Sequence, residues 1–134
     1  MLAVFGTGKT LLDAHIDKIG LVVTGMDPQG FLHAAPVGRA DTRVLAAADM
    51  TVYTAEKEFF AVAASVPPHL RGQTVYDAPP AEDLLFDIGF CGESLPPDIE
   101  PGDRLLFRPS FHTLSDGVVT SPYLDNSAGA AVLL

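Results

Sequence analysis

Residues 19–35, which read IGLVVTGMDPQGFLHAA, place two short apolar segments on either side of a turn. The segments, 19–26 and 31–35, are rich in the branched and apolar residues that favour strands. Pro28 suits the first central position of the turn because its ring fixes φ, and Gly30 suits the exit. The stretch therefore predicts a β-hairpin.

The same pattern runs through most of the chain, since short apolar segments alternate with clusters of Gly, Pro and Asp. Further strands are predicted at residues 2–5, 10–15, 49–54, 59–66, 84–89, 104–108, 111–114 and 118–121, with hairpin turns at GTGK, AEKE and SDG. Proline-rich segments at 66–72, 78–83 and 94–103 predict loops or single helical turns, because proline blocks helix interiors and central ladders. The sequence thus predicts a mainly β fold in which residues 25–118 form a small PDZ-like or barrel-like domain.

The two ends of the chain differ from this pattern. The only predicted helix is the apolar run 128–134, which has no stop signal, no Gly cap and no polar last turn. The first predicted strand, 2–5, starts almost at the first residue. These ends predict a fragment of a longer protein, in which the apolar face of the helix would pack on an element absent here.

Composition limits the classes of partner. Eight Lys and Arg against seventeen Asp and Glu give a net charge of −9, which would repel a phosphate backbone and excludes nucleic acid as an expected partner. No apolar run approaches the roughly 20 residues that span a bilayer, and the start lacks the layout of a signal peptide. A single cysteine, Cys91, excludes an internal disulfide framework and is predicted to be a buried apolar residue. We therefore expect a cytoplasmic protein without a membrane partner.

The first candidate site follows the apolar run at residues 11–12. Period two would put Asp13, His15 and Asp17 on one face of a strand. A metal site needs a neutral imidazole ligand and a carboxylate that takes the other ring proton, and His15 with Asp17 supplies both types of group. The same spacing also fits a strand whose polar face meets solvent, and the His-x-Asp pair taken alone favours that simpler interpretation.

The second candidate site is the polar group Asp125, Asn126 and Ser127, which comes just before the predicted helix. Asp, Asn and Ser are favoured helix caps, so an ordinary N-cap explains the composition. The functional interpretation instead gives Asp125 a carboxylate that bridges two cations and helps to lower the pKa of a bound water.

The remaining histidines have no partner at ligand spacing. His33, His69 and His112 are therefore expected to be structural or exposed. Asp27, Asp98, Asp103 and Asp116 all lie near Gly or Pro and are expected to be turn residues.

The order of these features resembles the tetrahedral aminopeptidases, dinuclear metallopeptidases that include glutamyl (deblocking) aminopeptidases and proteins labelled as endoglucanases. The segments that carry the resemblance are LLDAHIDKIGLVVTGMDPQGFL, VGRADTRVL, VPPHL, DLLFDIG, PGDRLLF and SPYLDNSAGAAVLL. The resemblance implies that residues 1–24 and 119–134 are parts of an incomplete α/β metallopeptidase domain. It also implies that residues 25–118 are an inserted dimerisation domain, whose dimers build larger shells.

The resemblance also implies roles for individual residues. His15 would ligate one metal ion, Asp17 would be a catalytic residue that holds His15 through its other ring nitrogen, and Asp125 would bridge two divalent ions, zinc or cobalt. A cis peptide bond is expected between Asp125 and Asn126. The remaining ligands and the catalytic Glu of the family would lie outside this chain, so it should not bind the metal pair tightly.

Two positions depart from the family pattern. Lys18 stands where the family usually has an acidic residue, and Ser127 stands where it often has Arg. Neither position is a metal ligand in the family. The departures bear on substrate preference and on the charge around the site.

Two functions of different classes follow. The first is a metal-dependent aminopeptidase that removes N-terminal residues from peptides, of which this chain would be a part that is inactive alone. The alternative is a β module that self-associates into a homodimer or a larger homo-oligomer without catalytic activity. A carbohydrate-active enzyme gains no support, because the chain has no Trp and no carboxylate pair that spacing identifies.

Overall fold

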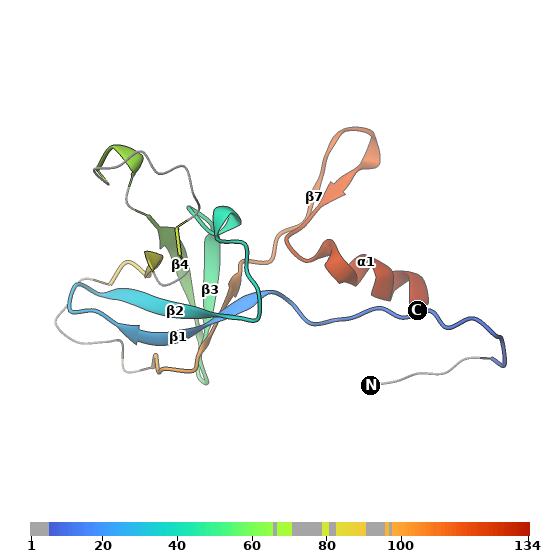
Figure 1. Ribbon diagram of the computed structural model, residues 1–134, viewed down its shortest axis with the longest axis horizontal. Helices are drawn as coiled ribbons and strands as arrows, with labels where there is room; N and C mark the ends of the chain where they lie inside the picture. The colour runs from blue at the N-terminus through green and yellow to red at the C-terminus, as the bar shows by residue number, and fades with distance from the viewer. Residues whose placement is uncertain (1–5, 66, 71–78, 81–82, 91–95, 97) are drawn as a thin grey trace. The chain divides into compact units, whose positions relative to one another are not determined.

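The computed structural model describes residues 6–65, 67–70, 79–80, 83–90, 96 and 98–134 (Figure 1). The chain divides into two compact units. One is Ile19–Arg108, and the other combines Met1–Lys18 with Pro109–Leu134. The predicted strand at 2–5 and Cys91 lie outside the described residues.

The unit Ile19–Arg108 is a closed β-barrel with the strand order β1-β2-β5-β4-β3-β6. All of its strand pairs are antiparallel, and β1 pairs with β6 to close the barrel. The strands are β1 Gly20–Met26, β2 Phe31–Val37, β3 Asp49–Tyr53, β4 Glu58–Ala64, β5 Leu85–Asp87 and β6 Arg104–Phe107 (Figure 1). The prediction of a mainly β fold with a small barrel is confirmed.

The hairpin predicted from residues 19–35 joins β1 to β2. The amide of Gly30 donates to the carbonyl of Asp27 at 3.0 Å, which closes the turn. The Asp27 side chain accepts from the amides of Gln29 and Phe31, each at 3.0 Å. Gly30 has a φ of 92°, a left-handed conformation that glycine adopts without a steric cost. The turn chemistry therefore sets the register of the first two strands.

Alternate residues of the barrel strands fill its interior. In β1 and β2 the inward side chains are Leu21, Val23, Leu32 and Ala34, each 5% exposed or less. Among the described residues, the core contains Leu21, Val23, Leu32, Ala34, Leu45, Met50, Val52, Ala61, Ala63, Leu84, Phe86, Ile99 and Leu105. The alternation of a strand therefore sorts most of these side chains between core and surface.

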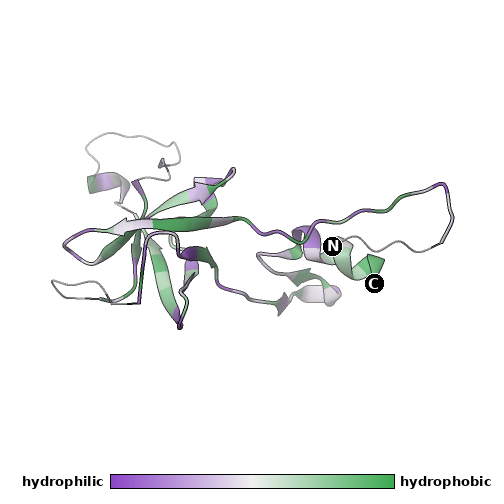
Figure 2. Cartoon of the chain, turned by 90° about the horizontal axis from the view of Figure 1, so that it is seen from below, coloured by the Kyte–Doolittle hydropathy of each residue, from purple (hydrophilic) through white to green (hydrophobic). Residues whose placement is uncertain are grey.

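The second unit contains a short sheet and one helix. Strands β7 His112–Thr113 and β8 Val119–Thr120 form a two-stranded antiparallel sheet, as the SDG turn predicted. Helix α1 spans Leu124–Leu133 and so begins four residues before the predicted start at 128. Figure 2 shows hydrophobic colour at the last turn of α1, where Val132 is 83% exposed.

One predicted strand is wrong. Residues 10–15 are extended but form no ladder, so the hairpin expected at GTGK does not form in the part that the structure describes. A strand needs a neighbouring strand to accept and donate its backbone hydrogen bonds, and no described strand pairs with this segment. The ladder begins only at Gly20, so the barrel takes in residues 20–24 and leaves residues 109–118 to the other unit.

Within the described ranges, no helix has both the length and the apolar character needed to cross a bilayer.

Candidate metal centre

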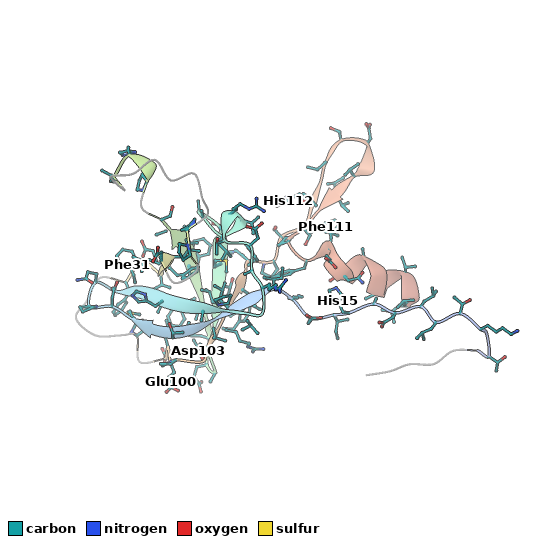
Figure 3. The ribbon with its side chains drawn as sticks, in the orientation of Figure 1. His15, Phe31, Glu100, Asp103, Phe111 and His112 are labelled. Carbon is teal, nitrogen blue, oxygen red and sulfur yellow. The ribbon has the colours of Figure 1, made fainter. Side chains whose placement is uncertain are left out.

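Two distant segments of the second unit meet at His15. Its Nε2 atom lies 3.1 Å from Oδ1 of Asp125, although 110 residues separate the two positions in the chain. Figure 3 labels His15 on the extended segment that precedes the barrel in sequence. Asp125 lies in the first turn of α1, and its side chain is 93% exposed. The structure thus brings together both residues that the sequence proposed as metal ligands.

The other ring nitrogen of His15 faces the second predicted partner. Nδ1 of His15 lies 3.1 Å from Oδ1 of Asp17. The two residues are two positions apart on a segment to which no helix or strand is assigned. Asp13, which was predicted on the same face, makes no such contact with His15 in the described part of the chain.

A neutral imidazole cannot donate a hydrogen bond to both of its carboxylate neighbours, so a cation could bind at one of its nitrogens. A neutral histidine has one N–H, whereas an ionised carboxylate only accepts, and His15 faces a carboxylate at each nitrogen. Donation from Nδ1 to Asp17 leaves the Nε2 lone pair directed at the oxygen of Asp125. This contact between two lone pairs is repulsive. A proton on Nε2, or a metal ion between Nε2 and Oδ1, would make it attractive.

The distance between Nε2 and Oδ1 is close to that of two ligands of one ion. Zinc binds nitrogen at about 2.0–2.1 Å and carboxylate oxygen at about 2.0–2.2 Å, so two ligands of a tetrahedral ion lie roughly 3.3–3.5 Å apart. The 3.1 Å between His15 and Asp125 is slightly shorter and is the length of an ordinary hydrogen bond, so a small outward shift of either side chain would admit an ion. Among the described residues, however, no group of three or more His, Cys, Asp or Glu side chains could hold an ion. The donors present therefore fit part of a metal site.

At the start of α1, Asn126 caps the helix and Asp125 faces His15. The peptide bond between Asp125 and Asn126 is cis, and both residues have non-helical φ and ψ angles. The Asn126 side chain accepts from the amide of Gly129 at 2.9 Å, which is the interaction of a helix cap. A Cβ atom on Gly129 would overlap that side-chain oxygen. Because Asn126 serves as the cap, the carboxylate of Asp125 remains available to face His15.

Two residues near the site were not identified as partners from the sequence. The Nζ atom of Lys18 lies 4.3 Å from the centre of the Tyr123 ring. Tyr123 is 8% exposed and precedes α1 directly. No local pattern relates positions 18 and 123, so only the folded chain reveals this contact.

His33 is exposed, as expected, with 42% of its side chain accessible, and its Nε2 lies 3.7 Å from Oδ2 of Asp27 across the β1–β2 hairpin. The expectation that Asp27 is a turn residue is confirmed, because the same carboxylate accepts two amides of the turn. Asp103 likewise accepts from the amide of Glu100 at 2.9 Å.

The sequence and the fold are similar to those of known peptidases. The sequence profile of the M42 glutamyl aminopeptidases matches residues 5–134, so the chain belongs to this family. A lysyl aminopeptidase of Pyrococcus furiosus is 31% identical over 88% of this chain and 35% of its own length. This chain therefore spans about a third of the length of that relative.

Solved structures give the same result. The TET1 peptidase of Pyrococcus horikoshii, described as assembling into a tetrahedron or a large octahedral shell, is 33% identical, with a TM-score of 0.75 over 90% of this chain and 37% of its own. A TET aminopeptidase from a marine sediment archaeon of the Thaumarchaeota is 26% identical, with a TM-score of 0.79 over 90% of this chain and 35% of its own.

Proposed function

We propose that this chain supplies one terminal ligand and one bridging ligand to a metal-dependent aminopeptidase that removes N-terminal residues from peptides. The observation that carries the proposal is the 3.1 Å approach of His15 to Asp125 from opposite ends of the chain, with Asp17 on the other ring nitrogen. Membership of the M42 family gives the class of reaction.

Each residue has a separate task in this proposal. Asp17 accepts the Nδ1 proton of His15, which fixes the tautomer and the plane of the ring. His15 then presents the lone pair of Nε2, and Asp125 presents a carboxylate that can reach two ions. When bound, a pair of zinc or cobalt ions would polarise the scissile carbonyl and lower the pKa of a water molecule.

The chain alone is expected to lack peptidase activity. A catalytic zinc site usually has three protein ligands, and the described residues provide two donors. Large apolar side chains of the same unit are also exposed, for example Leu11 at 83% and Val132 at 83%. We propose that the part of the family's usual length not spanned here covers these side chains and supplies the missing ligands and the general base.

A chimeric enzyme tests the proposal. Residues 5–134 would replace the matching segment of the Pyrococcus furiosus lysyl aminopeptidase, and the product would be assayed on aminoacyl chromogenic substrates with zinc or cobalt. We expect the chimera to cleave, and His15→Ala and Asp125→Asn to reduce kcat by at least about a hundredfold, because each removes a metal ligand.

Controls separate ligand loss from misfolding. His33→Ala removes a histidine that lies in the barrel and should leave kcat within about twofold, since surface substitutions rarely have larger effects. A folded chimera that keeps full activity without His15 would refute the assignment. Turnover by the 134-residue chain alone would show that further ligands are unnecessary.

A second candidate function rests on the barrel. Phe60 in β4 is 46% exposed, and Val37 and Val44 are 61% and 60% exposed, so the barrel has apolar side chains at its surface. The related TET1 peptidase is described as assembling into a tetrahedron or a large octahedral shell. Under this proposal Ile19–Arg108 serves as a self-association module. Gel filtration with light scattering should then show a dimer or larger species, and a monomer at high concentration would contradict it.

A further inference from the structure

The contact between Lys18 and Tyr123 joins the two segments that form the candidate metal centre. Lys18 comes three residues after His15 and directly after Asp17. Tyr123 comes two residues before Asp125. The ammonium lies 4.3 Å from the ring centre, well within the roughly 6 Å over which a cation is attracted to an aromatic face. The contact therefore lies beside both converging segments at once.

The polar contacts between these segments are exposed. The side chains of His15, Asp17 and Asp125 are 52%, 88% and 93% exposed, so solvent screens their mutual contacts. Tyr123, in contrast, is the one buried large side chain of this unit among the described residues. Its amide donates to the hydroxyl of Ser121 at 3.3 Å, which fixes the turn before α1. The ring is thus a fixed surface on which the flexible Lys18 side chain can rest.

We propose that Lys18 and Tyr123 are positioning residues whose cation–π contact holds the His15 segment in register with the start of α1. The inference rests on the proposed metal centre and adds to it the contact that aligns its two ligands. Neither residue would ligate the ion. Lys18 acts through the backbone that follows His15, and Tyr123 acts through the backbone that precedes Asp125.

Substitution of Lys18 changes metal affinity in opposite directions if Lys18 positions the ligands and if it acts only through its charge. An ammonium near the site repels a divalent cation, so removal of Lys18 should strengthen metal binding if charge alone matters. If Lys18 aligns the ligands, its removal should weaken metal binding despite the lost repulsion. The two explanations predict opposite directions for one substitution.

A metal-independent readout tests the contact itself. NMR spectra of the full chain should show the ε-methylene protons of Lys18 shifted upfield by the Tyr123 ring. Tyr123→Leu should abolish the shift, whereas Tyr123→Phe, which keeps the aromatic face, should preserve it. An unshifted ε-methylene in the unaltered chain would overturn the proposal.

Zinc titration, followed through the imidazole signals of His15, tests the consequence. We expect Lys18→Met and Tyr123→Leu each to weaken zinc binding by about two- to fivefold, and Lys18→Arg and Tyr123→Phe to retain it. Lys57→Met is the matched control, because Lys57 also lies over a ring, that of Phe59 at 4.8 Å, but in the barrel unit. The control should bind zinc like the unaltered chain.

The outcomes separate failure of this inference from failure of the proposed function. If the unaltered chain binds zinc and Lys18→Met binds it equally well or more tightly, the positioning role is wrong and the metal centre stands. If the His15 signals of the unaltered chain do not respond even to millimolar zinc, the aligned pair does not hold an ion and the positioning role is wrong, whereas the proposed function is tested separately by the chimera.

Discussion

Among the described residues, Asp41 is the carboxylic acid whose pKa departs most clearly from its ordinary value. Side-chain hydrogen bonds from Arg43, and then the Arg43 amide, lower the pKa of its carboxyl from 3.8 to about 2. The guanidinium reaches both carboxylate oxygens, with Nε 2.9 Å from Oδ1 and a second nitrogen 2.6 Å from Oδ2. The same carboxylate caps the single helical turn Thr42–Val44. Because the pKa of Asp41 is lower in the folded state, the pair stabilises the fold at pH values above the ordinary pKa of an aspartate.

We predict that carboxyl chemical shifts will give Asp41 a midpoint near pH 2. The stabilising contribution should be complete above about pH 4 and should disappear as the pH falls through about 2. Arg43→Gln should return the midpoint toward 3.8. A midpoint near 3.8 in the unaltered chain would show that solvent screening dissolves the pair.

Gly30 is required by both its conformation and its surroundings. Its φ is 92°, and a Cβ atom there would lie 2.5 Å from the carbonyl oxygen of Phe90. Gly30→Ala should therefore lower the free energy of unfolding by about 1–3 kcal/mol in urea titrations. Gly25→Ala in the same hairpin is the matched control, because nothing lies within 4 Å of its Cβ position. Equal effects of the two substitutions would contradict the steric explanation.

At the residue scale, the sequence singled out three side chains that the structure brings together, and it missed some of their neighbours. His15 lies beside Asp17 and Asp125, as a shared site requires, and their role in metal binding stays a proposal. The contact of Lys18 with Tyr123 and the pairing of His33 with Asp27 were missed. Such contacts depend on the three-dimensional path of the chain, which no local spacing records.

At the scale of elements, β5 joins the two halves of the barrel with only three residues. Its central residue, Phe86, lies opposite Leu32 of β2 and Ala63 of β4 and is 0% exposed. Phe86→Ala should lower the free energy of unfolding by about 3–5 kcal/mol, because it removes buried apolar surface and leaves a cavity. Urea denaturation followed by circular dichroism would measure this loss.

Phe60 provides the control for that substitution. It lies in β4 but is 46% exposed, so Phe60→Ala should cost less than about 1 kcal/mol. If both substitutions destabilised the chain equally, Phe86 would not be the anchor that its burial indicates.

The strands could be predicted to the extent that pairing is local. Hairpins β1–β2 and β3–β4 were found because turn residues and alternating apolar residues lie next to each other in sequence. Residues 10–15 have a comparable composition but no partner strand in the described chain, so composition alone gave the wrong answer there. Closure of the barrel by β1 and β6 also could not be predicted, since about 80 residues separate the two strands.

At the scale of the whole molecule, the buried apolar residues are concentrated in one unit. All thirteen members of the core cluster lie within Ile19–Arg108. In the other unit, large apolar residues such as Ile16 at 78%, Phe111 at 65% and Leu133 at 38% remain exposed, and Tyr123 is buried. A two-stranded sheet and a ten-residue helix are marginal elements without such a core. Stability should therefore differ between the two units.

We predict that hydrogen exchange will reveal this difference. Amides of β1 to β6 should be protected by several orders of magnitude more than those of β7, β8 and α1, because the barrel amides open only when the core unfolds. Saturating zinc should slow exchange in the first turn of α1, since an ion held by His15 and Asp125 ties that turn to a second segment. Equal protection of α1 and the barrel without metal would mean that the segments carrying His15 and Asp125 are already rigid. The metal would then add little order to the site.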